Sequence, residues 1–275
     1  SKSYGNKMLI EDLSLSIPKG SIVGIIGGNG AGKSTLFRMI AGTETPDSGT
    51  IDMGETVKVA YVEQTRDALN DNHTVWEAIS GGLDTLKIGN NYEVSSRAYV
   101  GRFNFKGTDQ QKRVGELSGG ERGRLHLANT LKQGANVLLL DEPFSNIDQS
   151  LKEELQLKIK KVLNEVNIST IIVTHDSYEA FYMGNKCGII LDQSLKQFDI
   201  PYNIYHYPNS VEVVNFLNRG ILIEAKVTGK DSLENTELGT IKGNFIKKQS
   251  IGSSVKLLIQ PEDLEHDDQS NLKLE

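Results

Sequence analysis

The fold is decided by the stretch Gly27-Gly28-Asn29-Gly30-Ala31-Gly32-Lys33-Ser34-Thr35. The apolar run 22–26 precedes it and the helix-like segment 36–41 follows it, so it connects a strand to a helix. The spacing G-x-x-x-x-G-K-S is that of a phosphate-binding loop, in which glycines turn backbone N–H groups inward. Lys33 supplies a positive charge for the β- and γ-phosphates, and Ser34 offers a hydroxyl to Mg²⁺. The alternative, a chance glycine-rich turn, does not account for the flanking strand and helix. The stretch therefore predicts a nucleoside triphosphate site.

Length and composition narrow the class of protein. A chain of 275 residues holds one large domain, or a large domain and a small one. The formal net charge of −6 argues against a surface that coats nucleic acid. The single cysteine, Cys187, excludes an internal disulfide and favours a reducing compartment. No run approaches the roughly 18 apolar residues of a transmembrane helix. We therefore expect a cytoplasmic protein with no direct membrane span, which reaches the inner face of the plasma membrane only through a partner.

Strand-like runs alternate with helix-like segments along most of the chain. The alternation predicts an α/β fold with a mostly parallel, helix-covered sheet, in which ligands lie beyond the carboxyl ends of the strands. After residue 220 the pattern changes to short alternating segments with turns between them, which indicates a small β domain. We expect domains at 1–220 and 221–275, with the second domain partial. The expected strands are 22–26, 57–62, 137–140, 170–173, 187–191, 221–227, 239–248 and 254–260, and the long helices are 120–132 and 149–166.

Two adjacent carboxylates follow the apolar run Val137-Leu138-Leu139-Leu140. Because that run is typical of an interior strand, Asp141 and Glu142 at its end need partners. We predict that Asp141 holds Mg²⁺ through water and that Glu142 polarises the water that attacks the γ-phosphate. A helix-capping role is the alternative for either residue alone, but it accounts less well for an adjacent pair.

A second candidate anion site is the sequence Leu117-Ser118-Gly119-Gly120-Glu121, which opens the predicted helix 120–132. We expect uncapped N–H groups and the positive end of the helix to face outward there and to bind an anion. Two phosphate-binding loops for one nucleotide are redundant unless each serves a different subunit.

Together these motifs resemble the ATP-binding cassette (ABC) ATPases, in which the Leu-Ser-Gly-Gly loop of one domain closes over ATP held by the phosphate loop of another. The resemblance implies a P-loop NTPase cassette that hydrolyses ATP with Mg²⁺. It also implies a helical subdomain, at about residues 65–125 here. The partner it implies is a second ABC domain, paired head to tail, either in a homodimer or as a separate partner cassette.

The resemblance extends to further positions. Gln64 is similar to the glutamine that reaches Mg²⁺ and the attacking water, and His175 is similar to the switch histidine that contacts the γ-phosphate. Ser145-Asn146-Ile147-Asp148 resembles the loop that couples the two sites, and Tyr4 resembles the aromatic residue that stacks on adenine, with a frayed terminus as the alternative. The candidate residues are Glu142, His175 and Gln64 for catalysis; Ser34, Gln64 and Asp141 for Mg²⁺; and Tyr4, Gly27, Asn29, Gly30, Ala31, Gly32, Lys33, Ser34, Thr35, Ser118, Gly119 and Gly120 for ATP.

The two halves of the chain resemble different branches of this family. Residues 1–140 resemble the second cassette of an ABC-F protein, an energy-dependent translational throttle, through Ser95-Ser96-Arg97-Ala98-Tyr99-Val100-Gly101-Arg102 and Gly115-Glu116-Leu117-Ser118-Gly119-Gly120-Glu121-Arg122. Residues 141–275 resemble an iron(III)- or maltose-type importer subunit, through Val173-Thr174-His175-Asp176-Ser177-Tyr178-Glu179-Ala180-Phe181 and Leu258-Ile259-Gln260-Pro261-Glu262-Asp263. Such subunits continue into a regulatory β domain of the OB or TOBE kind. Arginine, frequent before Asp141, recurs only at Arg219, and we interpret the chain as a composite.

Three functions stay open. The first is to energise solute import, of ferric iron for example, with a membrane permease; the single cassette and the β domain favour it. The second is that of an ABC-F translation factor on the ribosome, which residues 1–140 favour. The third is a composite ATPase with no native partner. Importer subunits meet their permease through the helical subdomain, and that segment is ABC-F-like here, which weighs against the first.

Overall fold

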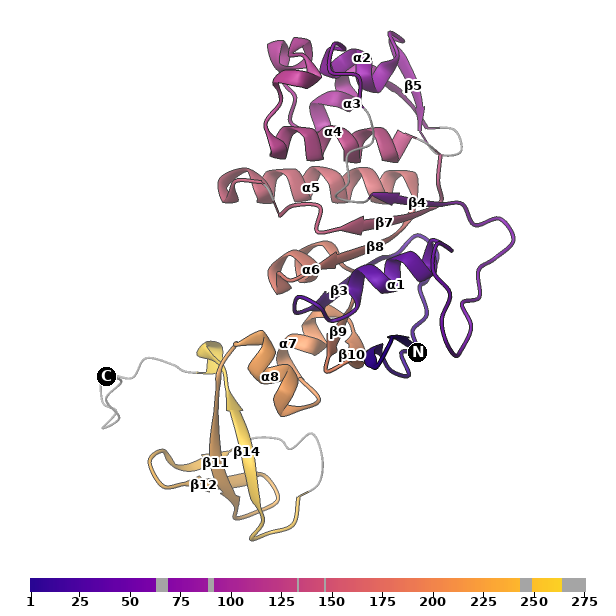
Figure 1. The fold of residues 1–275 in the computed structure, drawn as a ribbon. Coiled ribbons are helices and arrows are strands. Elements are labelled where there is room, and N and C mark those ends of the chain that lie inside the picture. Colours follow the sequence, from indigo (N-terminus) through magenta and orange to yellow (C-terminus); the bar gives the residue numbers. More distant parts are fainter. Residues whose placement is uncertain (63–68, 89–91, 133, 146, 243–248, 264–275) are drawn as a thin grey trace, which may run out of the picture. The chain divides into compact units, whose positions relative to one another are not determined.

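The chain folds into two compact units, Ser1–Asn209 and Ser210–Glu275 (Figure 1). The computed structural model describes residues 1–62, 69–88, 92–132, 134–145, 147–242 and 249–263. The boundary lies before helix α8 (Val211–Leu217) and not at residue 220, because that helix groups with the strands that follow it.

A six-stranded sheet in the order β10-β9-β3-β8-β7-β4 forms the centre of the first unit. Its strands β9, β3, β8, β7 and β4 run parallel, which confirms the predicted α/β class. Strand β10 pairs antiparallel with β9 and was not predicted, because its two apolar residues, Leu195 and Phe198, stand three positions apart and form neither an apolar run nor a strict alternation. The strands are β3 (Ile22–Gly27), β4 (Val59–Val62), β7 (Val137–Asp141), β8 (Ser169–Thr174), β9 (Lys186–Leu191) and β10 (Ser194–Asp199).

Different helices cover the two faces of this sheet. On one face, Val23 and Ile25 pack in a cluster with Phe37 of α1 (Lys33–Ile40). On the other face, Ile22 and Leu138 pack in a cluster with side chains of α4 (Gly119–Lys132) and α5 (Gln149–Val166). Because neighbouring residues of a strand point to opposite faces, α1 and α4 lie on opposite sides of the sheet. Helix α6 (Ser177–Met183) contacts β3 and β8.

The segment expected to be a helical subdomain gathers at one end of the first unit, beyond α5 (Figure 1). Its helices are α2 (Val75–Ser80), α3 (Ser96–Arg102) and α4, with the short 3₁₀ turns η1 (Gly107–Gln111) and η2 (Val114–Glu116). It also contains an antiparallel hairpin, β5 (Thr85–Ile88) with β6 (Tyr92–Ser95), which we did not predict. In β5 only Leu86 and Ile88 are buried, and a four-residue alternation is too short to distinguish from a loop.

The first unit is completed by an N-terminal strand pair and a short helix. Strand β1 (Lys2–Tyr4) pairs antiparallel with β2 (Lys7–Ile10). Helix α7 (Pro201–His206) follows β10.

The second unit holds α8 and an antiparallel sheet in the order β13-β12-β11-β14. Its strands are β11 (Ile221–Val227), β12 (Ser232–Asn235), β13 (Gly239–Lys242) and β14 (Ser254–Ile259), with the 3₁₀ turn η3 (Pro261–Asp263) after them. Ala225, Val227 and Leu233 form its small buried core. The predicted strand 239–248 extends beyond Lys242 into residues outside the described part. None of the helices in the described part of the chain is long and apolar enough to cross a membrane.

Candidate nucleotide site

The loop between β3 and α1 has a backbone that requires glycine. Gly30 and Gly32 lie at φ values of 78° and 87°, a region that residues with side chains rarely adopt. A Cβ atom on Gly32 would also lie 2.9 Å from the carbonyl oxygen of Leu9 in β2. Positive φ at these two glycines is compatible with the predicted anion nest, which stays a prediction.

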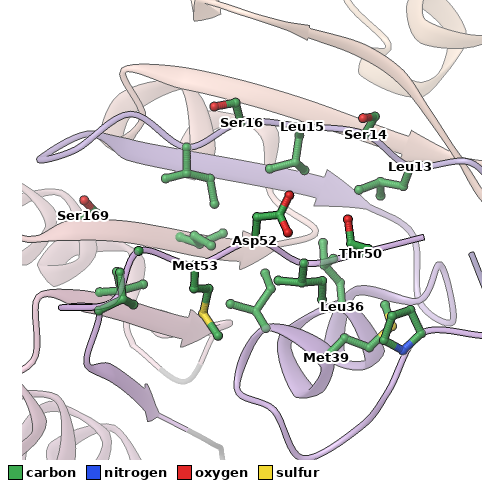
Figure 2. Close-up of a pocket in the computed structure, with 18 of the residues that line it drawn as sticks. Leu13, Ser14, Leu15, Ser16, Leu36, Met39, Thr50, Asp52, Met53 and Ser169 are labelled. Atoms are coloured by element: carbon green, nitrogen blue, oxygen red, sulfur yellow. The ribbon is translucent and has the colours of Figure 1, made fainter. Parts of the chain in front are cut away.

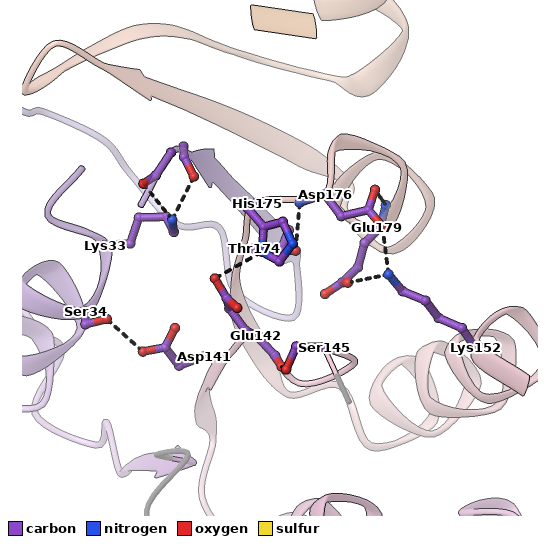
Figure 3. Close-up of polar contacts among 12 residues, drawn as sticks. Lys33, Ser34, Asp141, Glu142, Ser145, Lys152, Thr174, His175, Asp176 and Glu179 are labelled. Atoms are coloured by element: carbon purple, nitrogen blue, oxygen red, sulfur yellow. Dashed lines mark hydrogen bonds and ion pairs between the residues drawn. The ribbon is translucent and has the colours of Figure 1, made fainter. Parts of the chain in front are cut away.

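Lys33 places its charge over this loop (Figure 3). Its Nζ donates to the carbonyl oxygens of Gly27 at 2.7 Å and Gly28 at 3.0 Å, and only 6% of the residue is exposed. Burial lowers the pKa of Lys33, and the carboxylates of Glu142 and Asp141 oppose that shift. An ammonium group has three N–H donors. Two of them go to loop carbonyls among the described contacts, so the group lies fixed at the mouth of the loop.

Ser34 and Asp141 meet across the end of the sheet. The Ser34 hydroxyl donates to Asp141 Oδ2 at 3.0 Å, and the Tyr61 hydroxyl of β4 lies 3.5 Å from the same oxygen. Burial raises the pKa of Asp141, so its charged form needs a cation or hydrogen-bond donors. Hydroxyl and carboxylate oxygens are the ligands that Mg²⁺ prefers, and these two residues fit that ion. Gln64, the third predicted ligand, lies outside the described residues. Tyr61 gave no signal in the sequence, because it stands inside an apolar strand.

Glu142 and His175 come from two different strand ends and point toward each other (Figure 3). His175 Nδ1 lies 3.2 Å from Glu142 Oε1. The backbone N–H of Glu142 donates to the carbonyl oxygen of Val173 at 2.9 Å, which holds the end of β7 beside β8. Glu142 has a φ of 45°, a strained value for a residue with a side chain, and strain of this kind gathers at functional sites. The geometry brings the predicted base and the predicted switch residue together.

The remaining loop residues differ in what they can offer a ligand. Asn29 is exposed at the tip, and Ala31 is partly buried. Thr35 is only 4% exposed, and its hydroxyl lies 3.5 Å from Arg38. Thr35 therefore offers a ligand little accessible surface.

Tyr4 is tied to the segment that follows α1. Its hydroxyl donates to Glu44 Oε2 at 2.7 Å, and Lys2 Nζ lies 5.3 Å from the ring centroid. Strand β1, which carries Tyr4, pairs with β2, and β2 brings Leu9 against Gly32. The residue remains 43% exposed. Its described side-chain contacts are thus to Glu44 and Lys2, and part of its surface stays accessible to a ligand.

The predicted second anion site is more capped than we expected. Ser118 Oγ accepts a hydrogen bond from the Glu121 N–H at 3.3 Å, and Glu121 Oε2 accepts one from the Ser118 N–H at 2.9 Å. This reciprocal pair is a capping box, so the helix start is not fully uncapped. Gly119 and Gly120 follow in the first turn of α4. Because α4 and α1 lie on opposite faces of the sheet, one chain does not bring Ser118 to its own phosphate loop. Among the described residues no hydrogen bond joins 118–120 to 27–35.

Of two cavities in the described part of the chain, only the smaller one is lined by residues of the predicted site. The larger, of about 750 Å³, lies on the α1 face between residues 13–17 and 50–54, with Leu13, Leu15 and Met53 around it (Figure 2). None of the described residues that line it belongs to the predicted site, and its lining is mostly apolar and hydroxyl groups, which do not match a triphosphate. The smaller cavity, of about 130 Å³, has a lining that includes Glu142, His175, Lys152, Asp176 and Glu179.

Comparison with known proteins identifies two kinds of relative. A family model described as ABC transporter matches residues 10–145. The energy-dependent translational throttle protein EttA of Escherichia coli K12 is 62% identical over 177 residues, which are 64% of this chain and 31% of that protein. EttA of Mycobacterium tuberculosis H37Rv is 49% identical over 190 residues, 69% of this chain and 33% of that protein. The Fe(3+) ions import ATP-binding protein FbpC 2 of Pectobacterium atrosepticum is 29% identical over 277 residues, 96% of this chain and 78% of that protein.

These matches bear on the interpretation of the chain as a composite. The chain spans about a third of the length of the throttle proteins that it matches. A stretch that covers 64% of the chain includes its midpoint, so the similarity to throttle proteins extends past Asp141. The similarity to the importer protein includes nearly the whole chain at a lower identity. The change in composition at Asp141 is therefore not where similarity to the throttle proteins ends.

Proposed function

We propose that the chain is an ATPase domain of the ABC transporter family, which binds ATP with Mg²⁺ at loop 27–35 and hydrolyses it after pairing head to tail with a second such domain; the match of residues 10–145 to the ABC transporter model supports this. One observation carries this proposal. Lys33, Ser34, Asp141, Glu142 and His175 converge on one edge of the sheet from three different strands and their following loops. This is the arrangement that phosphoryl transfer to water needs: a phosphate cradle, metal ligands and a base.

The proposed mechanism assigns each group a step. Lys33 and the loop N–H groups hold the β- and γ-phosphates, and Ser34 and Asp141 would hold Mg²⁺, which neutralises phosphate charge when bound. Glu142 orients a water molecule and takes its proton while the water oxygen bonds to the γ-phosphorus and the bond to the ADP oxygen breaks. His175, held beside Glu142 at 3.2 Å, contacts the γ-phosphate from the end of the neighbouring strand β8. Tyr4 offers its accessible surface to the adenine ring.

Pairing with a second domain accounts for the position of Ser118. The serine and its two glycines present a helix start on the sheet face opposite the phosphate loop. In a head-to-tail pair, residues 118–120 of each domain cover the nucleotide of the other. The second domain is another copy of this chain or a partner cassette.

Nucleotide-dependent sizing tests this pairing. We expect Glu142→Gln to elute as a dimer with ATP and Mg²⁺ and as a monomer with ADP, because ATP joins the two domains. Adding Ser118→Arg should keep the protein monomeric with ATP, since an exposed arginine at the helix start obstructs closure, while ATP binding to the monomer stays within about twofold. The matched control is Ser250→Arg, an exposed serine in the second unit, which should still dimerise. Dimerisation that survives Ser118→Arg would remove the assignment of residues 118–120.

Two partners are proposed, and each has an observation in its favour. Solute import with a membrane permease is supported by the similarity to the Fe(3+) import protein, which includes 96% of this chain and hence most of the second unit. A ribosome-associated role in translation is supported by the 62% identity to the throttle protein, about twice the identity to the import protein. A composite ATPase without a native partner is the remaining alternative. Each of these places the protein in the cytoplasm, and the first places it at the inner face of the plasma membrane.

The ATP-trapped variant separates the two partners. If the translational role holds, Glu142→Gln with ATP should pellet with purified ribosomes, whereas the same variant carrying Ser118→Arg should stay in the supernatant. If the import role holds, the wild-type protein should bind vesicles that contain an importer permease, and its ATP turnover should rise there. Empty vesicles are the control for the second arm. Failure in both arms supports the composite without a partner.

A further inference from the structure

A cluster of charged side chains lies beside His175, on the side away from Lys33 and Ser34 (Figure 3). Lys152 of α5 donates to Asp176 Oδ2 at 2.7 Å and lies 3.2 Å from Glu179 Oε2 of α6. The side chains of Lys152 and Glu179 are 13% and 2% exposed, so this contact is largely shielded from water. Neither the phosphate loop nor the proposed mechanism uses these three residues.

Asp176 fixes the turn that carries His175. Its Oδ1 accepts hydrogen bonds from the N–H groups of Tyr178 at 2.9 Å and Glu179 at 3.3 Å, which caps α6. Its own N–H donates to Thr174 Oγ1 at 3.1 Å. His175 itself is exposed, and its described hydrogen bond is the one to Glu142. The direction of the imidazole therefore depends on the turn formed by its two neighbours.

Lys152 connects this turn to the loop that follows Glu142. Helix α5 begins at Gln149, directly after loop 145–148, and the Lys152 N–H donates to the carbonyl oxygen of Asp148 at 3.0 Å. At the other end of the loop, Ser145 Oγ donates to the Glu142 carbonyl oxygen at 3.0 Å. The 130 Å³ cavity lies between the loop and the turn. Lys152 thus spans from the residues after the base to the residues around the switch histidine.

We propose that Lys152 is a positioning residue, which holds the turn 174–176 against the start of α5 so that His175 and Glu142 keep their mutual geometry. The proposal rests on the proposed ATP hydrolysis. Asp176 is the contact through which Lys152 acts.

The buried carboxyl group of Glu179 increases the cost of removing Lys152. One of its oxygens, Oε2, lies 3.2 Å from Lys152 Nζ. Burial raises the pKa of Glu179 to about 7, and the nearby Lys152 charge opposes that shift. Without Lys152, the pKa of Glu179 rises further, and Asp176 loses the ion pair that holds it against the start of α5.

The kinetic test compares two lysines on the same helix. We expect Lys152→Met to lower kcat for ATP hydrolysis by about 10- to 100-fold, the effect of misplacing a reacting group by about 1 Å, with KM for ATP changed less than about twofold. Lys160→Met is the matched control. Lys160 also bridges α5 and α6, donating to the Tyr182 carbonyl oxygen at 2.5 Å, but at the far end of α6. The kcat of Lys160→Met should stay at the wild-type value. The kcat of Lys152→Arg should lie closer to that of the wild type than the kcat of Lys152→Met does.

A double-mutant cycle shows whether Lys152 acts through the histidine. In a His175→Ala background, Lys152→Met should lower kcat no further, while its effect on Tm persists. A full additional loss of kcat in that background would mean that Lys152 has a general structural role and would overturn the proposal.

Amide hydrogen exchange without nucleotide keeps this test independent of hydrolysis. The N–H groups of Tyr178 and Glu179 donate hydrogen bonds to Asp176 Oδ1. Both should exchange faster in Lys152→Met than in the wild-type protein or in Lys160→Met. Equal exchange in all three proteins would overturn the proposal. A wild-type protein that hydrolyses no ATP would overturn the proposed function, and the exchange data would still decide whether Lys152 holds the turn.

Discussion

Replacing Glu142 with glutamine should slow ATP turnover at least about 10²-fold, the scale of general-base catalysis, while ATP still binds. The amide keeps the shape of the side chain and can still hydrogen-bond His175, which lies 3.2 Å from Glu142 Oε1, but it cannot take the proton of the attacking water. The phosphate contacts of Lys33 and the metal ligands Ser34 and Asp141 are untouched by the change. Phosphate release measures the turnover, and equilibrium binding of a fluorescent ATP analogue measures the affinity.

The control for this variant is Glu153→Gln on α5. Glu153 is exposed and stands near the start of α5, away from the phosphate loop, so the same loss of one negative charge should leave turnover within about twofold of wild type. Turnover at the wild-type rate in Glu142→Gln would refute Glu142 as the base. A loss of ATP binding in Glu142→Gln would instead indicate that the charge of Glu142 is needed to form the nucleotide site.

The parts of the site that the sequence predicted are those that lie at the ends of buried strands. The strands that precede Gly28, Glu142 and His175 are continuous apolar runs, and such runs are interior in a parallel sheet. Once they are placed side by side, their carboxyl ends must meet, so the residues after them converge. The long helix 149–166 was predicted with the bounds that α5 has, because its apolar residues recur with helical spacing over many turns.

The parts that the sequence did not predict depend on contacts between distant residues. Lys152 and Glu179 stand on separate helices, and nothing in their local pattern marks them as partners. The capping box of Ser118 and Glu121 is different, since the pattern S-x-x-E is itself a recognised helix start. From the sequence we interpret Ser118 only as an anion site, although the same four residues also predict the cap. Asp176 before α6 is a similar case, because Asp followed by Glu179 three positions later also indicates a helix start.

Replacing Lys33 with alanine should abolish useful ATP binding, with Kd raised about 10²-fold. The Nζ atom is held at the mouth of the loop by the carbonyl oxygens of Gly27 and Gly28, so its charge is already aimed where the β- and γ-phosphates bind. A hydrogen bond to a charged group contributes about 1.5 to 3 kcal/mol, and the upper end of that range corresponds to this change in Kd. Isothermal titration with ATP and Mg²⁺ measures it.

The same substitution removes the two contacts to the loop carbonyls, so weaker binding could arise from a disordered loop as well as from a missing charge. Comparing ATP with AMP separates these causes, because AMP lacks the phosphates that Lys33 contacts. If the charge is what matters, Lys33→Ala should weaken ATP binding far more than AMP binding, and the control Lys58→Ala, at an exposed lysine, should change neither. Equal weakening for both nucleotides would assign Lys33 to the architecture of the loop, and the predicted anion nest of Gly30 and Gly32 would then be the main source of phosphate affinity.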